Sequence, residues 1–245
     1  MDCIEQAVVI GLERVRLRIA EAEVRFGRTP GSVQLLAVSK VQPAVKIAAA
    51  FAVGQTAFGE SYTQEALKKQ AELRDLPVHW HFIGRIQSNK TQDIATGFDW
   101  VHSVCELKHA RRLGSQRPKD RPPLRLCVQV NLSGEASKAG LAPEQVGTFI
   151  NACAEIDGVC VEGLMTLPAP SADLDAQRRP FADLRALRDR LARPGLALPT
   201  LSMGMSNDLE AAIAEGATIV RIGTAIFGAR PDLQSFATPL TKPCQ

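Results

Sequence analysis

The chain has 245 residues, 45% of them hydrophobic, which is enough for one domain with a substantial core. Its 29 basic and 26 acidic side chains give a formal charge of +3, too small to indicate binding to nucleic acid or to an anionic membrane. No apolar run approaches the roughly 20 residues of a membrane span. The six cysteines form no C-x-x-C pair, which favours a reducing, cytoplasmic location. We expect a small molecule as the partner.

The predicted elements alternate between helices and short apolar strands. An N-terminal amphipathic helix is predicted over residues 4–26, because apolar residues recur along one face. Eight apolar segments follow, and several are near-continuous, as in strands buried on both faces. The predicted strands are 33–40, 56–60, 80–84, 100–104, 124–132, 161–167, 200–205 and 219–228. The predicted helices between them are 43–53, 63–73, 89–96, 106–113, 143–156, 173–191 and 208–215.

This order predicts an α/β fold. We expect a single (β/α)8 barrel of the TIM type over residues 33–230, with an extra N-terminal helix within residues 1–30, so that residues 1–245 form one domain. A doubly wound open sheet could be assembled from the same units. The polar residues at the strand ends favour the barrel.

The first candidate is Lys40, which closes the apolar run of the first predicted strand. In a β/α barrel the reactive groups lie just beyond the C-terminal ends of the strands. A lysine partly desolvated there has a lowered pKa and becomes a nucleophilic amine, which suits a Schiff base. The alternative is a lysine whose charge reaches solvent, and this segment alone favours that alternative.

Two later strand ends could bind an anion. Residues 201–208 run from a strand into small residues, where backbone N–H groups and the Ser206 hydroxyl could receive an anion at a helix start. Residues 221–224, Arg-Ile-Gly-Thr, supply a matching element on the eighth strand. Loops after the seventh and eighth strands are the customary phosphate position of barrel enzymes. Each motif alone also occurs in ordinary turns.

The histidines give no metal site or catalytic triad. His79 and His81 would share one face of a strand, a spacing that two metal ligands can use. No third ligand accompanies them, so packing near the strand start is the favoured interpretation. His102 and His109 are interpreted as isolated, since no Ser or Cys stands in a nucleophile motif near them.

Seven segments resemble, in order and at family spacing, the YggS/PROSC family of pyridoxal phosphate homeostasis proteins. They are residues 37–40, 58–62, 81–84, 87–90, 163–165, 201–206 and 220–230. The resemblance implies a barrel similar to the N-terminal domain of alanine racemase, which carries pyridoxal 5'-phosphate (PLP) as a Schiff base on the lysine of the first strand, here Lys40.

The resemblance also implies roles for the other pocket residues. It assigns the phosphate to Ser206, Gly223 and Thr224, the ring nitrogen or the phosphate to Arg221, and the pocket wall to Met205. A cation beside the ring nitrogen cannot stabilise a protonated pyridine, so the ring would be a weaker electron sink for carbanion chemistry.

The function implied by the resemblance is reversible PLP binding, in intracellular PLP homeostasis and delivery to PLP-requiring apoenzymes, without catalytic turnover. In alanine racemase a second domain of the partner subunit supplies a tyrosine as second base. Only about fifteen residues follow Arg230 here, too few for such a domain, and a monomer is expected. The alternative is a PLP-dependent amino-acid racemase or related enzyme on a monomeric barrel, with Tyr62, the only tyrosine, as second base. A structural protein that has lost the cofactor is disfavoured, since Lys40 and the phosphate elements are present.

The sequence departs from the family pattern in three places. Ser61 stands where Asn is usual, Arg85-Ile86 where Pro-Leu is usual, and Gln42 where many members have a second lysine. These departures put contacts beside the ring, and any transfer of PLP between lysines, in doubt. Residues 133–140, including Lys138, retain the family loop after the fifth strand, and we expect this loop to gate the pocket.

Overall fold

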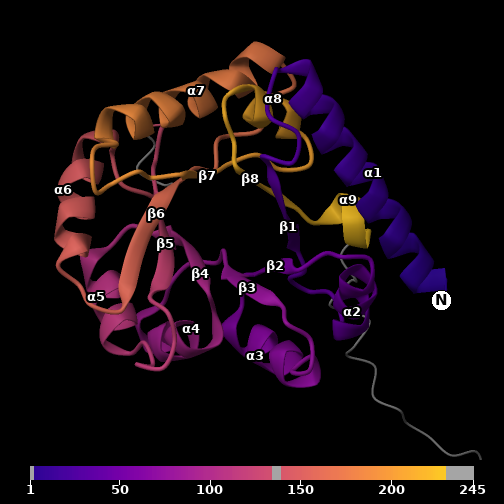
Figure 1. Ribbon diagram of the computed structural model, residues 1–245, viewed down its shortest axis with the longest axis horizontal. Coiled ribbons are helices and arrows are strands. Elements are labelled where there is room, and N and C mark those ends of the chain that lie inside the picture. Colours follow the sequence, from indigo (N-terminus) through magenta and orange to yellow (C-terminus); the bar gives the residue numbers. More distant parts are fainter. Residues whose placement is uncertain (1–2, 134–138, 230–245) are drawn as a thin grey trace, which may run out of the picture.

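The computed structural model describes residues 3–133 and 139–229, and its eight parallel strands close into a barrel (Figure 1). Each strand pairs with the next along the chain, and β8 pairs with β1, with Ala37 opposite Ile222. The strands are β1 Gln34–Val38, β2 Ala57–Glu60, β3 His79–Phe82, β4 Trp100–Val104, β5 Leu124–Gln129, β6 Val159–Met165, β7 Thr200–Ser202 and β8 Ile219–Ile222. The predicted barrel is confirmed, and the open sheet is excluded.

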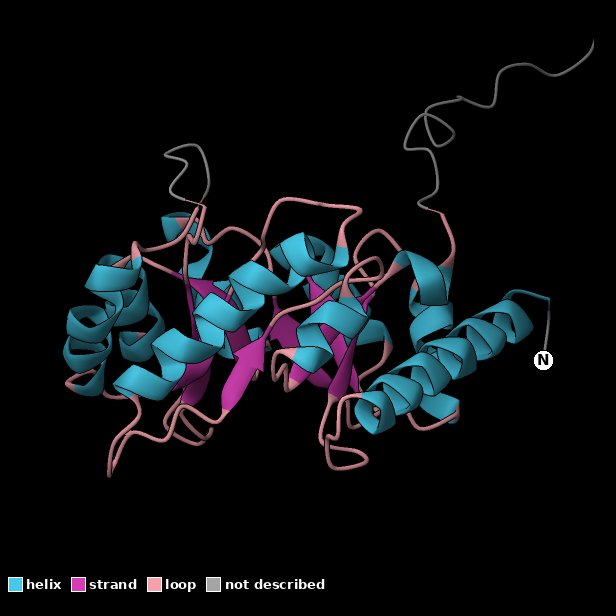
Figure 2. Ribbon diagram, turned by 90° about the horizontal axis from the view of Figure 1, so that it is seen from above, coloured by secondary structure: helices cyan, strands magenta, loops and turns pink. Residues whose placement is uncertain are grey.

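Helices surround the strands, as both ribbon views show (Figures 1 and 2). They are α1 Cys3–Arg25, α2 Ala44–Ala52, α3 Thr63–Glu72, α4 Thr91–Gly97, α5 Leu107–Ser115, α6 Pro143–Ala154, α7 Leu174–Leu191, α8 Leu209–Ala214 and α9 Thr224–Phe227, with a 3-10 turn η1 at Ser88–Lys90. The predicted N-terminal helix is confirmed as α1, which packs against α2, α8 and α9. No helix in the described ranges is long and apolar enough to cross a membrane.

The predicted eighth strand is wrong beyond Ile222. The backbone turns at Gly223, whose carbonyl accepts hydrogen bonds from the N–H groups of Ile226 and Phe227, and α9 begins there. Ile226 and Phe227, which suggested a continuing strand, are buried instead where α9 packs against α1. Gly11 of α1 allows this packing, because a Cβ atom there would lie 2.7 Å from the Ile226 carbonyl oxygen. Strand β5 also ends earlier than predicted, at Gln129.

The apolar core lies mainly between the strands and the helices. Inside the barrel, a separate small cluster of Leu36, Ala57 and Ile219 packs with Ile83. Barrel interiors are usually filled by branched apolar side chains, but here the strands β3, β4, β7 and β8 contribute buried polar groups instead. Those groups are His81, His102, Ser202 and Arg221. Of these four residues, Arg221 also lines the candidate site.

Candidate functional site

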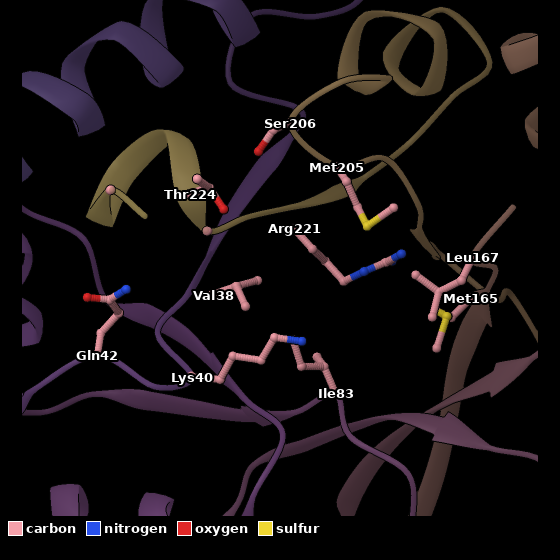
Figure 3. Close-up of a pocket in the computed structure, with 12 residues that line it drawn as sticks. Val38, Lys40, Gln42, Ile83, Met165, Leu167, Met205, Ser206, Arg221 and Thr224 are labelled. Carbon is pink, nitrogen blue, oxygen red and sulfur yellow. The ribbon is translucent and has the colours of Figure 1, made fainter. Parts of the chain in front are cut away.

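A cavity of about 210 Å³ is lined by all six residues that the sequence nominated. Its walls come from β1 and the turn after it, from the residue after β3, from the end of β6 and the loops after β6 and β7, and from the end of β8 and the start of α9. Figure 3 shows the Lys40 and Arg221 side chains extended into the cavity, with the Ser206 and Thr224 hydroxyls together on another side of it. The predicted set is Lys40, Met205, Ser206, Arg221, Gly223 and Thr224. Their common location agrees with the prediction, while their roles toward a ligand stay predictions.

Lys40 lies in the turn after β1. A network of charged residues contacts the backbone of this turn before and after Lys40. We call Ser39, Glu60, Glu65 and Lys69 the Lys69 network. The Lys69 ammonium lies 2.7 Å from Glu60 Oε1 and 2.5 Å from Glu65 Oε1, and donates a hydrogen bond of 2.8 Å to the Ser39 carbonyl. The Ser39 hydroxyl donates to Glu60 Oε1 at 2.6 Å. Burial raises the pKa of Glu60, against the opposing effect of Lys69.

The residue after Lys40 is strained. Val41 has φ +63°, a left-handed conformation that a β-branched residue rarely adopts and that costs about 1–3 kcal/mol. Its N–H donates a hydrogen bond of 2.6 Å to Glu65 Oε1, which also accepts from Lys69. The Lys69 network therefore fixes the backbone immediately before and immediately after Lys40.

Arg221 is a buried cation with neutral partners. Its guanidinium donates hydrogen bonds of 2.7 Å to the Ser202 hydroxyl and 2.9 Å to the Thr166 carbonyl. Ser202 Oγ lies 2.7 Å from His102 Nδ1, and His102 Nε2 lies 2.9 Å from His81 Nδ1. We call Arg221, Ser202, His102 and His81 the Arg221 chain. No carboxylate in the described ranges lies within 4 Å of this guanidinium.

Burial dominates the protonation of the Arg221 chain. It lowers the pKa of Arg221 to about 10, so the guanidinium keeps its charge near neutral pH. It lowers the pKa of His81 to about 3, and it lowers the pKa of His102 well below the usual value, with like charges adding to both effects. The chain thus carries one positive charge at its Arg221 end. The interpretation of His102 as isolated is wrong.

The loop that presents Met205 and Ser206 is fixed by backbone geometry and by α1. Gly204 has φ +94°, and a Cβ atom there would lie 2.6 Å from the Ala212 side chain, so only glycine fits. The Met205 N–H donates to Asp208 Oδ1 at 2.5 Å. Arg18 of α1 donates to the Ser206 carbonyl at 3.1 Å while pairing with Glu210. The N-terminal helix therefore supports one wall of the cavity.

Six lining residues were absent from the predicted set. They are Val38, Gln42, Ile83, Met165, Leu167 and Gly228. Met165 had a signal, because it ends its strand, and Gln42 stands where the family often has lysine. Gln42 Oε1 accepts a hydrogen bond of 2.8 Å from Lys46, which also donates to the Phe227 carbonyl at 2.7 Å. Lys46 thus connects Gln42 to the C-terminal end of α9 by hydrogen bonds.

The other departures from the family pattern lie outside this cavity. Ser61 and Arg85 line a separate hollow of about 260 Å³ with Tyr62. Tyr62 is 58% exposed and does not line the Lys40 cavity, which weakens it as a second base. Lys138, expected in a gating loop, lies outside the described residues.

The histidine pair on β3 splits between two environments. His79 is exposed, whereas His81 is buried and stacks on Trp100 with ring centroids 5.5 Å apart. Packing, the favoured interpretation of the pair, holds for His81. Within residues 3–133 and 139–229, no group of three or more His, Cys, Asp or Glu could hold a metal ion.

The chain matches the family described as alanine racemase, N-terminal domain, over residues 11–231. It is similar to the pyridoxal phosphate homeostasis protein of Pseudomonas aeruginosa, with 57% identity over 219 residues that cover 89% of this chain and 94% of that protein. The protein of the same name from Escherichia coli (strain K12) is 44% identical over 226 residues, covering 89% of this chain and 95% of that protein.

Solved structures agree with these relatives. PipY of Synechococcus elongatus with PLP bound has a TM-score of 0.76 and 40% identity, covering 86% of this chain and 100% of that chain. Alanine racemase from Corynebacterium glutamicum, at 20% identity, has a TM-score of 0.66 and covers 92% of this chain and 61% of that chain, a likeness of fold alone. The family match and the identities to the named relatives place this chain in the alanine racemase N-terminal domain family, among the pyridoxal phosphate homeostasis proteins.

Proposed function

We propose that this protein binds PLP in the Lys40 cavity, covalently on the Lys40 amine, and takes part in intracellular PLP homeostasis. The observation that carries the proposal is that one cavity gathers a lysine, a buried arginine and two hydroxyl groups. These groups suit a phosphorylated aldehyde, because the amine can condense with the aldehyde and the other side chains can donate hydrogen bonds to the phosphate. Relatives at 57% and 44% identity bear the homeostasis name, and PipY has been solved with PLP bound.

The residues present fit the cofactor. Ser206 and Thr224 offer hydroxyl donors on one side of the cavity, where the phosphate would be held. Gly223 lies close to β1, since a Cβ atom there would be 3.1 Å from the Val38 carbonyl oxygen, and it leaves the backbone accessible to a phosphate. Arg221 places a positive charge in the wall, and Met205 closes a side. Bound PLP supplies an aldehyde that condenses with a primary amine, with loss of water.

We propose further that the protein is a carrier without catalytic turnover. Racemisation requires two bases on opposite faces of the ring. Of the described residues that line the cavity, only Lys40 and Arg221 can titrate, and Arg221 retains its proton at neutral pH because its pKa, lowered by burial, is about 10. Lys40 is then the one base among the described residues that line the cavity. We also propose that the protein delivers PLP to apoenzymes and is a cytoplasmic monomer. It would form a single domain, with its barrel over residues 33–230.

The attachment is tested by trapping. Purified protein is incubated with PLP, reduced with borohydride and analysed by peptide mass spectrometry. We expect one phosphopyridoxyl group on Lys40, lost in Lys40→Ala and retained in Lys68→Ala, whose lysine is exposed on α3. Equal labelling of Lys40→Ala and the unaltered protein would refute Lys40 as the anchor.

Turnover is tested separately. The holoprotein is mixed with a panel of L-amino acids in deuterium oxide. The carrier proposal predicts α-proton exchange no faster than with PLP alone. Exchange above that rate, abolished in Tyr62→Phe, would establish the racemase alternative.

A further inference from the structure

The Arg221 chain crosses the barrel interior from β8 through β7 to β4 and β3, and the binding roles above use only its first member. Its other members are buried, with His81 1% exposed and His102 and Ser202 0%. Buried polar groups without partners are costly, yet these groups contact one another at 2.7–2.9 Å. The Arg221 chain is therefore a continuous hydrogen-bonded array in the barrel interior beside the cavity.

The hydrogen bonds of the chain run in one direction. Arginine can only donate, so Ser202 Oγ accepts from Arg221. The remaining contact of that hydroxyl in the described residues is His102 Nδ1, so its proton lies on that bond and His102 Nδ1 accepts. A neutral His102 then carries its proton on Nε2 and donates to His81 Nδ1. Both imidazoles are thus the Nε2–H tautomer.

Resting on the proposed function, we propose that Ser202, His102 and His81 are positioning residues that orient the Arg221 guanidinium and leave its positive charge directed at the bound cofactor. A carboxylate partner would hold the guanidinium equally well but would cancel its charge. A directional chain of neutral groups stabilises the cation by polarisation and adds no negative charge. The titratable groups that act on Arg221 are Cys127, Asp208 and His102, and none of them lies in an ion pair with it.

The first test needs no cofactor. The whole protein has four histidines, so long-range ¹H–¹⁵N NMR spectra of ¹⁵N-histidine-labelled protein can be assigned by single substitutions. We expect His81 and His102 to be neutral Nε2–H tautomers at pH 7, and Ser202→Ala to change the His102 signals while those of exposed His79 stay unchanged. A proton on His102 Nδ1 in the unaltered protein would overturn the direction of the chain.

The second test measures the charge in the cavity. A positive charge beside the cofactor disfavours protonation of the linkage to Lys40, so cancelling it should raise the midpoint of the absorbance–pH titration of the holoprotein. For Ser202→Asp we expect a rise of about one pH unit and roughly tenfold weaker PLP binding. Ser202→Thr, which keeps the hydroxyl, should match the unaltered protein. Gln64→Asp, which adds the same charge at an exposed position outside the cavity, should leave the midpoint unchanged.

Ser202→Ala covers the case in which Ser202→Asp does not fold. It should weaken PLP binding several-fold, with a shifted midpoint, and Ser202→Thr should restore both. If Ser202→Ala keeps the affinity and the midpoint of the unaltered protein, the positioning role is refuted, while trapping on Lys40 would still support the proposed function. If trapping on Lys40 fails but the histidine tautomers are as expected, the attachment to Lys40 is refuted, and only the orientation of Arg221 by its neutral partners is supported.

Discussion

Two buried polar clusters flank the Lys40 cavity, and they treat their cation in opposite ways. In the Lys69 network, an ammonium lies within 2.7 Å of two carboxylates. In the Arg221 chain, a guanidinium contacts a hydroxyl and a carbonyl, with two neutral imidazoles behind them. The first cluster neutralises its cation and the second leaves it uncompensated.

The difference corresponds to what each cluster adjoins. The Lys69 network touches backbone atoms on either side of Lys40, so its charges act on the shape of a turn and do not line the cavity. The Arg221 guanidinium lines the cavity itself, where an uncompensated charge can act on an anionic ligand. Buried ion pairs are therefore expected to control stability here, and the neutral chain to control the electrostatics of the site.

The largest expected effect is in the Lys69 network. Lys69→Met removes the cation from between Glu60 and Glu65 and leaves the fully buried Glu60 without its charged partner. Breaking a buried pair in this way destabilises by about 3–5 kcal/mol, measured as the free energy of unfolding in urea. The matched control is Lys68→Met, on the exposed side of α3, expected within about 0.5 kcal/mol of the unaltered protein.

An equal, small effect of both substitutions would show that the network does not hold the fold. The rate of PLP trapping on Lys40 tests whether the Lys69 network also affects the site. Because Lys69 donates to the Ser39 carbonyl, Lys69→Met should also slow trapping of PLP on Lys40, whereas Lys68→Met should not.

Sequence patterns predicted the barrel because eight apolar segments alternate with helical stretches. They could not locate the end of β8, since the apolar residues Ile226 and Phe227 fit a buried strand as well as a helix that packs against α1. The strand-end rule nominated Lys40 because a cation that ends an apolar run carries a chemical signal. Val38, Ile83 and Leu167 also line the cavity, but apolar side chains carry no such signal.

The two buried clusters depend on contacts that sequence spacing leaves open. Glu65 and Lys69 are four residues apart on one helix, which predicts a pair, but the approach of Lys69 to Ser39 depends on how α3 packs on the barrel. His81 and His102 occupy neighbouring strands, and their contact depends on the register that sets His81 opposite Trp100. Inward-facing histidines on adjacent strands were the available signal.

His81, at the far end of the Arg221 chain, should make stability depend on pH. Burial holds the pKa of His81 at about 3 in the folded protein, below the unfolded value near 6.5. The unfolded state therefore binds the extra proton between these values, and stability is lost as pH falls below 6.5. At pH 5 this loss is about 2 kcal/mol from His81 relative to pH 7.5. Urea unfolding at the two pH values measures it.

Two substitutions on the same strand separate this effect from a general one. His81→Gln should reduce the loss between pH 7.5 and 5, because the titrating group is gone. His79→Gln, two residues earlier at an exposed position, should retain it. Identical pH dependence in the two variants would remove His81 as its source.

The smallest expected effect tests whether the strained turn at Val41 matters for PLP binding separately from the stability of the fold. Val41→Gly relieves the strain of φ +63° but adds backbone entropy to the unfolded chain, so the net change in unfolding free energy should be within about 1 kcal/mol, toward stabilisation. Val45→Gly, in α2, should destabilise by a few tenths of a kcal/mol. Only Val41→Gly should weaken PLP binding, because only that change loosens the backbone next to Lys40. Unchanged PLP affinity in Val41→Gly would mean that the strained turn has no part in PLP binding.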